Sequence, residues 1–71
     1  MIVLRSGAGV VAQFDDHRGY GTVRDAGGEE WFFHCIAIAD GTRTIEEGAQ
    51  VTFDLVAGRL GRWEAASVRG S

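Results

Sequence analysis

The side chains with the clearest chemical potential in this chain are three flat rings, those of Tyr20, Phe32 and His34. In extended segments, alternate side chains point to opposite faces of a sheet. If Val23 and Phe33 face the core, the three rings are left together on the outer surface. Exposed rings of this kind act as platforms for unstacked bases, each worth about 1–3 kcal/mol. The pattern therefore predicts a surface that binds a single nucleic-acid strand by stacking.

The segment HRGYGTV, residues 17–23, places a cation and two glycines around Tyr20. Arg18 can contact a phosphate, and its planar guanidinium can stack as well as form ion pairs. Gly19 and Gly21 carry no Cβ atom, so we expect them to leave room for a base to lie flat and for the backbone to come close. The segment therefore predicts a stacking site with a phosphate contact beside it.

Period-two patterning predicts the elements that must position these side chains. It indicates five short strands, over residues 9–15, 20–24, 31–35, 49–58 and 63–69. Only residues 36–40 are a candidate for helix, one turn long. Five short strands leave exposed edges, and closing them into a small five-stranded antiparallel Greek-key barrel, the OB-fold, removes most of these edges. The predicted fold class is therefore all-β, with a flat meander as the alternative.

Chain length and charge limit the size of the domain and the strength of charge-driven binding. The 71 residues make one domain, taken as 1–71, in which residues 1–8 are an N-terminal extension or the start of the first strand. A formal charge of −3 argues against a strongly cationic nucleic-acid binder, although a few cations on one face remain compatible with binding.

Cysteine usage and hydropathy indicate the compartment. The one cysteine, Cys35, permits no internal disulfide, and no zinc spacing such as C-x-x-C occurs. The apolar run MIVL is too short for the core of a signal peptide, and no apolar run is long enough for a membrane span. We therefore expect a cytoplasmic protein in a reducing setting, with no membrane contact.

Two motifs resemble those of the cold-shock domain family. RGYGTV (18–23) looks like the family's K-G-F-G-F-I motif, and WFFHC (31–35) looks like its V-F-V-H-F motif. The resemblance extends over residues 9–69, where TIEEGAQVTFDLVAG is similar to T-L-E-E-G-Q-x-V-x-F-x-I-V-x-G. It implies a five-stranded OB barrel that binds single-stranded RNA and DNA on the face carrying both motifs. In bacteria the family serves as RNA chaperone and transcription antiterminator.

The chain also departs from the family pattern. Residues that the family uses for stacking or charge are replaced at five positions, by Ala12, Gln13, Thr22, Cys35 and Thr42. The three rings named above remain, with Phe14 at their margin. Trp63, beside Arg62, is interpreted as a partial substitute near the last loop. The resemblance therefore implies weak, largely sequence-independent binding to single-stranded RNA or DNA.

A second class of function keeps the barrel but uses it as a protein-interaction or homodimerisation module. The net acidity and the lost aromatic positions favour this alternative, and the remaining rings with Trp63 would supply the contact surface. The expected oligomeric state is a monomer or a weak homodimer.

No constellation for catalysis, cofactor binding or metal binding stands out in the sequence. His34 and Cys35 are adjacent in a predicted strand, so their side chains diverge. The glutamate pairs at 29–30 and 46–47 are interpreted as solvated turns. GAGVVA (7–12) fits the dinucleotide fingerprint but lacks the βαβ unit that this motif requires. We therefore expect no enzyme activity, no cofactor and no metal.

Overall fold

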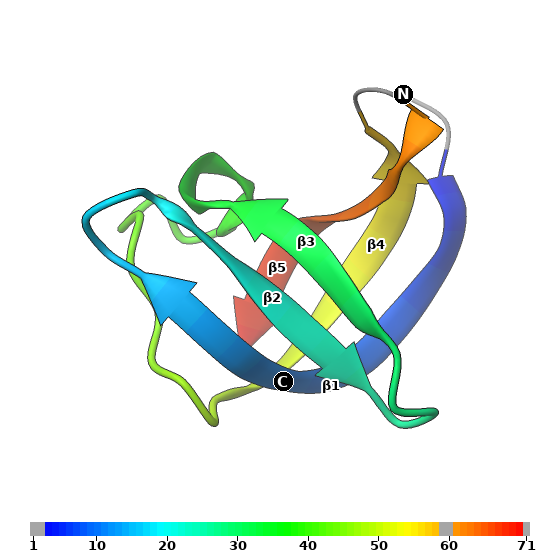
Figure 1. Ribbon diagram of the computed structural model, residues 1–71, viewed down its shortest axis with the longest axis horizontal. Coiled ribbons are helices and arrows are strands. Elements are labelled where there is room, and N and C mark those ends of the chain that lie inside the picture. The colour runs from blue at the N-terminus through cyan, green and yellow to red at the C-terminus, as the bar shows by residue number, and fades with distance from the viewer. Residues whose placement is uncertain (1–2, 59–60, 71) are drawn as a thin grey trace.

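The computed structural model describes residues 3–58 and 61–70, whose strands close into a barrel (Figure 1). The five strands are β1 (Val3–Asp15), β2 (Tyr20–Asp25), β3 (Glu30–His34), β4 (Gln50–Ala57) and β5 (Trp63–Gly70). A short 3-10 turn, η1 (Cys35–Ala37), follows β3 at the position where one helical turn was a candidate. The predicted all-β, five-stranded fold is confirmed.

The strand order around the barrel is β1-β2-β3-β5-β4. The pairs β1–β2, β1–β4, β2–β3 and β4–β5 are antiparallel, as predicted, whereas the closing pair β3–β5 is parallel and meets at Phe32 and Glu64. Because β3 pairs with β5 and β4 returns to β1, the flat meander is excluded.

The interior of the barrel is filled by apolar side chains that alternate along each strand. Val23 and Phe33 are both 0% exposed, which confirms the premise that leaves the rings on the outside. On β4, Val51, Phe53 and Leu55 are buried in the same core. For a chain of 71 residues, about 0.05–0.15 kcal/mol per residue gives an expected stability of roughly 4–10 kcal/mol.

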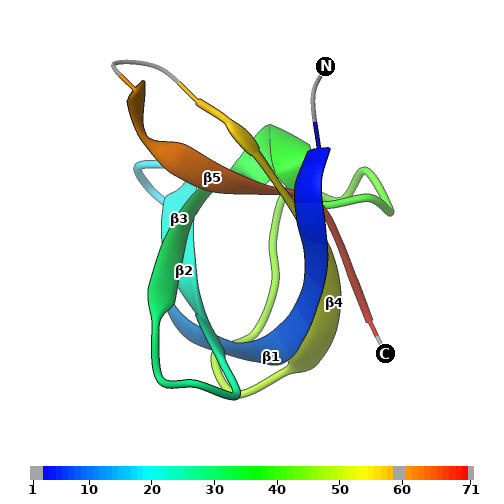
Figure 2. The same cartoon turned by 90° about the vertical axis from the view of Figure 1, so that its right-hand side faces the viewer.

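β1 is much longer than the predicted strand 9–15. Of the N-terminal residues 1–8, positions 3–8 belong to β1 and pair with β4, while positions 1 and 2 lie outside the described residues. The Ser6 hydroxyl donates a hydrogen bond to Asp54 Oδ1 across this pair, at 2.8 Å. Figure 2 shows how β1 bends around one end of the barrel, so that its first half pairs with β4 and its second half pairs mainly with β2.

The barrel itself requires glycine at both positions that flank Tyr20. A Cβ atom at Gly21 would overlap the carbonyl oxygen of Gln13 on β1, so glycine here lets β1 and β2 approach each other. Gly19 has a φ of +74°, a backbone conformation that residues other than glycine rarely adopt. The missing Cβ atom of Gly21 thus makes room for β1, and the expectation that it also clears space for a base stays a prediction.

Asp25 connects β1, β2 and β3 at one end of the barrel. Its Oδ2 accepts a hydrogen bond from Trp31 Nε1 at 2.9 Å, and its Oδ1 accepts the backbone N–H groups of Gly27 and Glu29. Arg5 lies 3.9 Å from the same carboxylate and 5.8 Å from the centroid of the Trp31 ring. The hydrogen bond from Trp31 is the main reason why the pKa of Asp25 is lowered, with smaller contributions from the two backbone N–H groups and Arg5.

Candidate nucleic-acid interface

The three predicted rings form one contiguous surface on β2 and β3. The strand register pairs Tyr20 with His34 and Thr22 with Phe32, which sets Phe32 diagonally across from Tyr20. The ring centroids of Tyr20 and Phe32 are 5.4 Å apart, and those of Phe32 and His34 are 4.7 Å apart in an edge-to-face arrangement. His34 is exposed and the other two rings are half-buried. The structure therefore brings together the rings that alternation predicted.

Arg18 lies at the edge of this ring surface. Its Nη1 donates a hydrogen bond to the Tyr20 hydroxyl at 3.2 Å, and its Nε lies 3.9 Å from Asp15 Oδ2. The hydrogen bond with Tyr20 is the largest cause of the raised pKa of Arg18, followed by the charge of its neighbours. The guanidinium stays charged beside the rings, with part of that charge offset by a carboxylate.

Phe14 lies at the margin of the interface and is tied to the core. Its ring stacks on the buried Phe33 with centroids 5.7 Å apart and planes at 12°. Its backbone N–H donates a hydrogen bond to Glu47 Oε2 at 3.1 Å. One face of the Phe14 ring therefore packs against the core, and the exposed part of the residue borders an open hollow.

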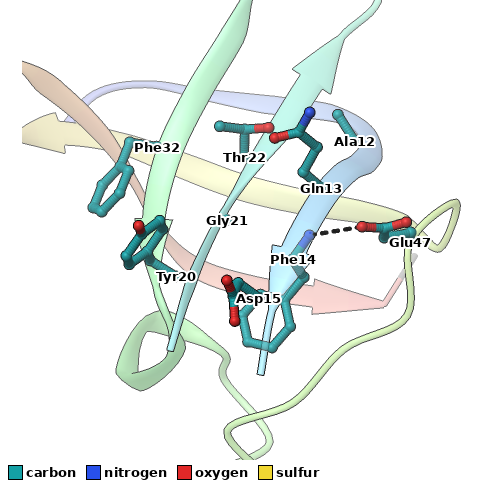
Figure 3. Close-up of a pocket in the computed structure, with 9 residues that line it drawn as sticks. All are labelled: Ala12, Gln13, Phe14, Asp15, Tyr20, Gly21, Thr22, Phe32 and Glu47. Atoms are coloured by element: carbon teal, nitrogen blue, oxygen red, sulfur yellow. Dashed lines mark hydrogen bonds between the residues drawn. The ribbon is translucent and has the colours of Figure 1, made fainter. Parts of the chain in front are cut away.

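This hollow has a volume of about 620 Å³ and runs from the rings across β2 to β1. Figure 3 shows its nine lining residues, with Tyr20 and Phe32 at one side and Glu47 at the other. The lining consists of Ala12, Gln13, Phe14, Asp15, Tyr20, Gly21, Thr22, Phe32 and Glu47. Two of the nine are carboxylates and none is basic.

Trp63 begins β5 and Arg62 precedes it, so neither residue comes from the two strands that carry the rings. Trp63 is 38% exposed at the start of β5, and its neighbour Glu64 is the residue that pairs with Phe32. Because side chains alternate along a strand, those of Trp63 and Glu64 point to opposite faces of β5. Arg62 is exposed, and its carbonyl accepts the N–H of Gly58 at 2.6 Å. The structure does not bring Trp63 onto the face that carries Phe32.

Two glutamates have contacts that the sequence interpretation missed. Glu30, expected in a solvated turn, begins β3 and accepts hydrogen bonds from Thr22 Oγ1 and Arg24 Nη2, both at 3.0 Å. The hydrogen bond from Arg24, followed by that from Thr22, lowers the pKa of Glu30. Glu47, also expected in a solvated turn, is bound to β1 through Phe14. The local sequence does not indicate these contacts, because the partners of Glu30 lie on β2 and the partner of Glu47 lies on β1.

Among residues 3–58 and 61–70, no group of three or more His, Cys, Asp or Glu side chains could hold a metal ion. None of the helices in these same ranges is long and apolar enough to cross a membrane.

A closed five-stranded barrel with clustered rings on one outer face defines a small OB-type binding domain. The chain matches the family model described as "'Cold-shock' DNA-binding domain" over residues 7–71. It therefore belongs to the cold-shock DNA-binding domain family, and nucleic-acid binding is the function of that family.

Individual relatives agree with this assignment. The chain is 43% identical over 61 residues to the cold shock-like protein CspD of Bacillus cereus, covering 84% of this chain and 91% of that protein. It is 43% identical over 63 residues to the cold shock-like protein CspA of Stigmatella aurantiaca, covering 86% and 91%. The solved structure of drosophila Unr CSD456 matches with a TM-score of 0.77 at 22% identity, over 94% of this chain and 27% of that one. This last likeness shows the fold alone.

Proposed function

We propose that this protein binds single-stranded RNA or DNA weakly and with little sequence preference, by stacking bases on Tyr20, Phe32 and His34. The observation that carries the proposal is the contiguity of the three rings on the outer face of β2 and β3, with centroid distances of 5.4 and 4.7 Å. Every base has a π-face, so stacking on such rings tolerates sequence. The matching cold-shock family model supports the same role.

Three stacking platforms set the scale of the affinity. At about 1–3 kcal/mol each they supply roughly 3–9 kcal/mol before the cost of ordering the strand. A dissociation constant of 1 μM corresponds to about −8 kcal/mol, so we expect micromolar or weaker binding.

Charge adds little to this binding. Arg18 is close to Asp15, and Arg24 is paired with Glu30 at 3.0 Å, so the cations nearest the rings are partly neutralised. With about two phosphate contacts, at about −0.7 per contact on single strands, the log–log salt slope should be near −1.4.

Titration of fluorescently labelled oligo-dT and oligo-U at low salt, repeated at several salt concentrations, tests the proposal. We expect saturable micromolar or weaker binding with the shallow slope given above. A duplex of equal length is the control, because its bases are already stacked, and it should bind more weakly. Absence of binding to either single strand, or tighter binding to the duplex, contradicts the proposed function.

In a cell, binding of this kind would keep RNA single strands from pairing, which is the proposed basis of a role as RNA chaperone or in transcription antitermination. The proposal involves binding alone and includes no chemical step.

A second candidate function is protein interaction or homodimerisation. Among the residues that the structure describes, four large apolar side chains outside the ring surface are exposed, including Ile36 at 74% and Trp63 at 38%. Sedimentation across a range of concentrations distinguishes the two functions. A dimer that shields tryptophan fluorescence and does not bind oligo-dT would favour this second function.

A further inference from the structure

A second hollow lies across β3 from the first, where η1 meets β4 and β5. It has a volume of about 740 Å³, and five of the twelve described residues that line it are alanines. Ile36, Ala37 and Ile38 line it on the side of η1, so we call it the η1 groove. Because most of its side chains are small and apolar, the groove offers an apolar space that a larger side chain could fill.

Ile36 projects from η1 at the rim of this groove. It is 74% exposed, whereas Ile38 is buried in the core two residues later. The segment is fixed at both ends, because the Cys35 N–H donates to the Gly19 carbonyl at 2.7 Å and the Ala39 N–H donates to the Val68 carbonyl at 2.8 Å. A single exposed apolar side chain is ordinary, but one held beside an apolar hollow marks a contact surface.

Charge around the η1 groove is sparse for an acidic protein. Among the described residues that line it, Glu64 is the only carboxylate and none is an arginine. Glu64 pairs with Phe32, so its side chain shares the outer face with the rings. His34 lines the same groove and can donate a ring N–H to a carboxylate. Chains with a formal charge of −3 repel each other least through a face of this composition.

This face has the features of both sides of a contact. It carries a protruding apolar side chain beside an apolar hollow, and a hydrogen-bond donor near a carboxylate. In a two-fold dimer the same patch of each copy meets the other, so each feature must find its complement on the same face. Ile36 of each copy can then enter the groove of the other, with His34 facing Glu64 across the contact.

We propose that this protein forms a weak two-fold homodimer through the η1 groove, with Ile36 of each copy inserted into the groove of the second copy. This inference gives the second candidate function a defined surface and does not depend on base stacking. The surface differs from the one expected from the sequence, because Trp63 points to the opposite face of β5 from Glu64. About twelve residues line the groove, against roughly 20–30 on each side of a stable interface, so the dissociation constant should be about 10 μM to 1 mM.

Sedimentation equilibrium of the wild-type protein from about 10 μM to 2 mM, at about 0.15 M salt to screen the net charge, tests this dimer. The average mass should rise from 7.6 kDa toward twice that value. Ile36→Ser should raise the dissociation constant at least tenfold, because each dimer buries two of these side chains. Leu4→Ser is the matched control, since Leu4 is 53% exposed and does not line the groove, and it should associate as the wild-type protein does.

A second variant tests the other wall of the groove. Ala57→Glu places a larger, charged side chain at an exposed lining position on β4, and it should weaken association as strongly as Ile36→Ser. Circular dichroism verifies that each variant is folded.

Three results overturn the inference: a wild-type protein that stays at 7.6 kDa over the whole range, association of folded Ile36→Ser and Ala57→Glu equal to that of the wild-type protein, or equal losses in Ile36→Ser and Leu4→Ser. A monomeric wild-type protein whose oligo-dT affinity falls in Ile36→Ser would assign the groove to a nucleic-acid strand instead. Because no nucleic acid enters the sedimentation experiment, a failed dimer leaves the proposed function intact, and failed oligonucleotide binding leaves the dimer intact.

Discussion

At the scale of single residues, Gln13 marks the limit of the proposed stacking surface. It is exposed on β1 and lies beside Thr22 on β2, which separates it from Phe32 on β3. The family has a ring at this position, whereas this chain has an amide, so position 13 contributes no ring to the hollow. Affinity in this protein should therefore be limited by the number of rings on the face.

Gln13→Trp should restore a platform and tighten binding of oligo-dT by about 1–3 kcal/mol, roughly five- to 150-fold. The same labelled-oligonucleotide titration measures this gain. Gln50→Trp introduces the same side chain on β4, away from the rings, and should leave the affinity unchanged. An equal gain in both variants would show that a tryptophan acts nonspecifically.

The ring cluster could be predicted from the sequence because alternation along two adjacent strands decides which side chains share a face. The shared face of Tyr20, Phe32 and His34 follows from that rule once Phe33 is assigned to the core. The contact of Glu47 with Phe14 could not be predicted, since it depends on where the loop after η1 returns to β1. Trp63 lies on the opposite face of β5 from Glu64, an orientation that a motif with one added residue does not specify.

At the scale of elements, the close approach of β1 and β2 holds the ring surface in place. Gly21 is a buried residue of β2, and its missing Cβ leaves space for the backbone of Gln13 and Phe14 on β1. The glycine thus serves the sheet that carries the rings, while the rings themselves lie on the outer face.

Gly21→Ala should destabilise the fold by about 1–3 kcal/mol or more, because the added methyl group overlaps the backbone of β1. Urea unfolding followed by circular dichroism measures the loss. Gly70→Ala is the control, since a Cβ atom there meets nothing within 4 Å and the residue is near the end of β5. Equal unfolding midpoints for the Gly21→Ala and wild-type proteins would contradict the close approach described here.

The Asp25 cluster joins the turn between β2 and β3 to the N-terminal half of β1. Because the pKa of Asp25 is lowered in the folded state, its carboxylate stabilises the fold above its unfolded pKa of about 3.9. This stabilisation is lost as the pH falls through the lower folded value. Trp31 is the main hydrogen-bond partner of the Asp25 side chain. The hydrogen bond from its indole N–H explains why a residue as large as tryptophan lies at this end of the barrel.

Asp25→Asn should therefore be less stable than the wild-type protein at neutral pH, and the difference should shrink as the pH falls below about 4. Thermal unfolding of both proteins between neutral and acidic pH measures this difference. Glu46→Gln removes an equal charge from an exposed site and serves as the control. A difference that stays constant with pH would contradict the assigned role of the carboxylate.

Strand positions were predicted to within one or two residues except at the start of β1. Residues 3–8 contain Gly7 and Ser6, which interrupt alternation, so their pairing with β4 leaves little local signal. The parallel closing contact between β3 and β5 likewise depends on the closed barrel as a whole.

At the scale of the whole molecule, an acidic protein carries the proposed stacking surface, and the two arginines nearest to it have carboxylate neighbours. The formal charge of −3 repels phosphates at long range, and the cations nearest the rings have carboxylate neighbours. In the proposed function, attraction between the protein and a single strand would therefore come mainly from contact with the bases. This balance predicts a binder whose affinity depends on rings much more than on salt.

The most direct measurement of that dependence is the affinity of Phe32→Ala for oligo-dT at low salt, alongside its urea unfolding midpoint. Phe32 contacts both other rings, so its removal should weaken binding by about 1–3 kcal/mol, roughly five- to 150-fold, while the unfolding midpoint changes little. Leu4→Ala removes an apolar side chain that is 53% exposed near the start of β1 and should bind as the wild-type protein does. Wild-type affinity in a folded Phe32→Ala protein would contradict binding by stacking on this surface.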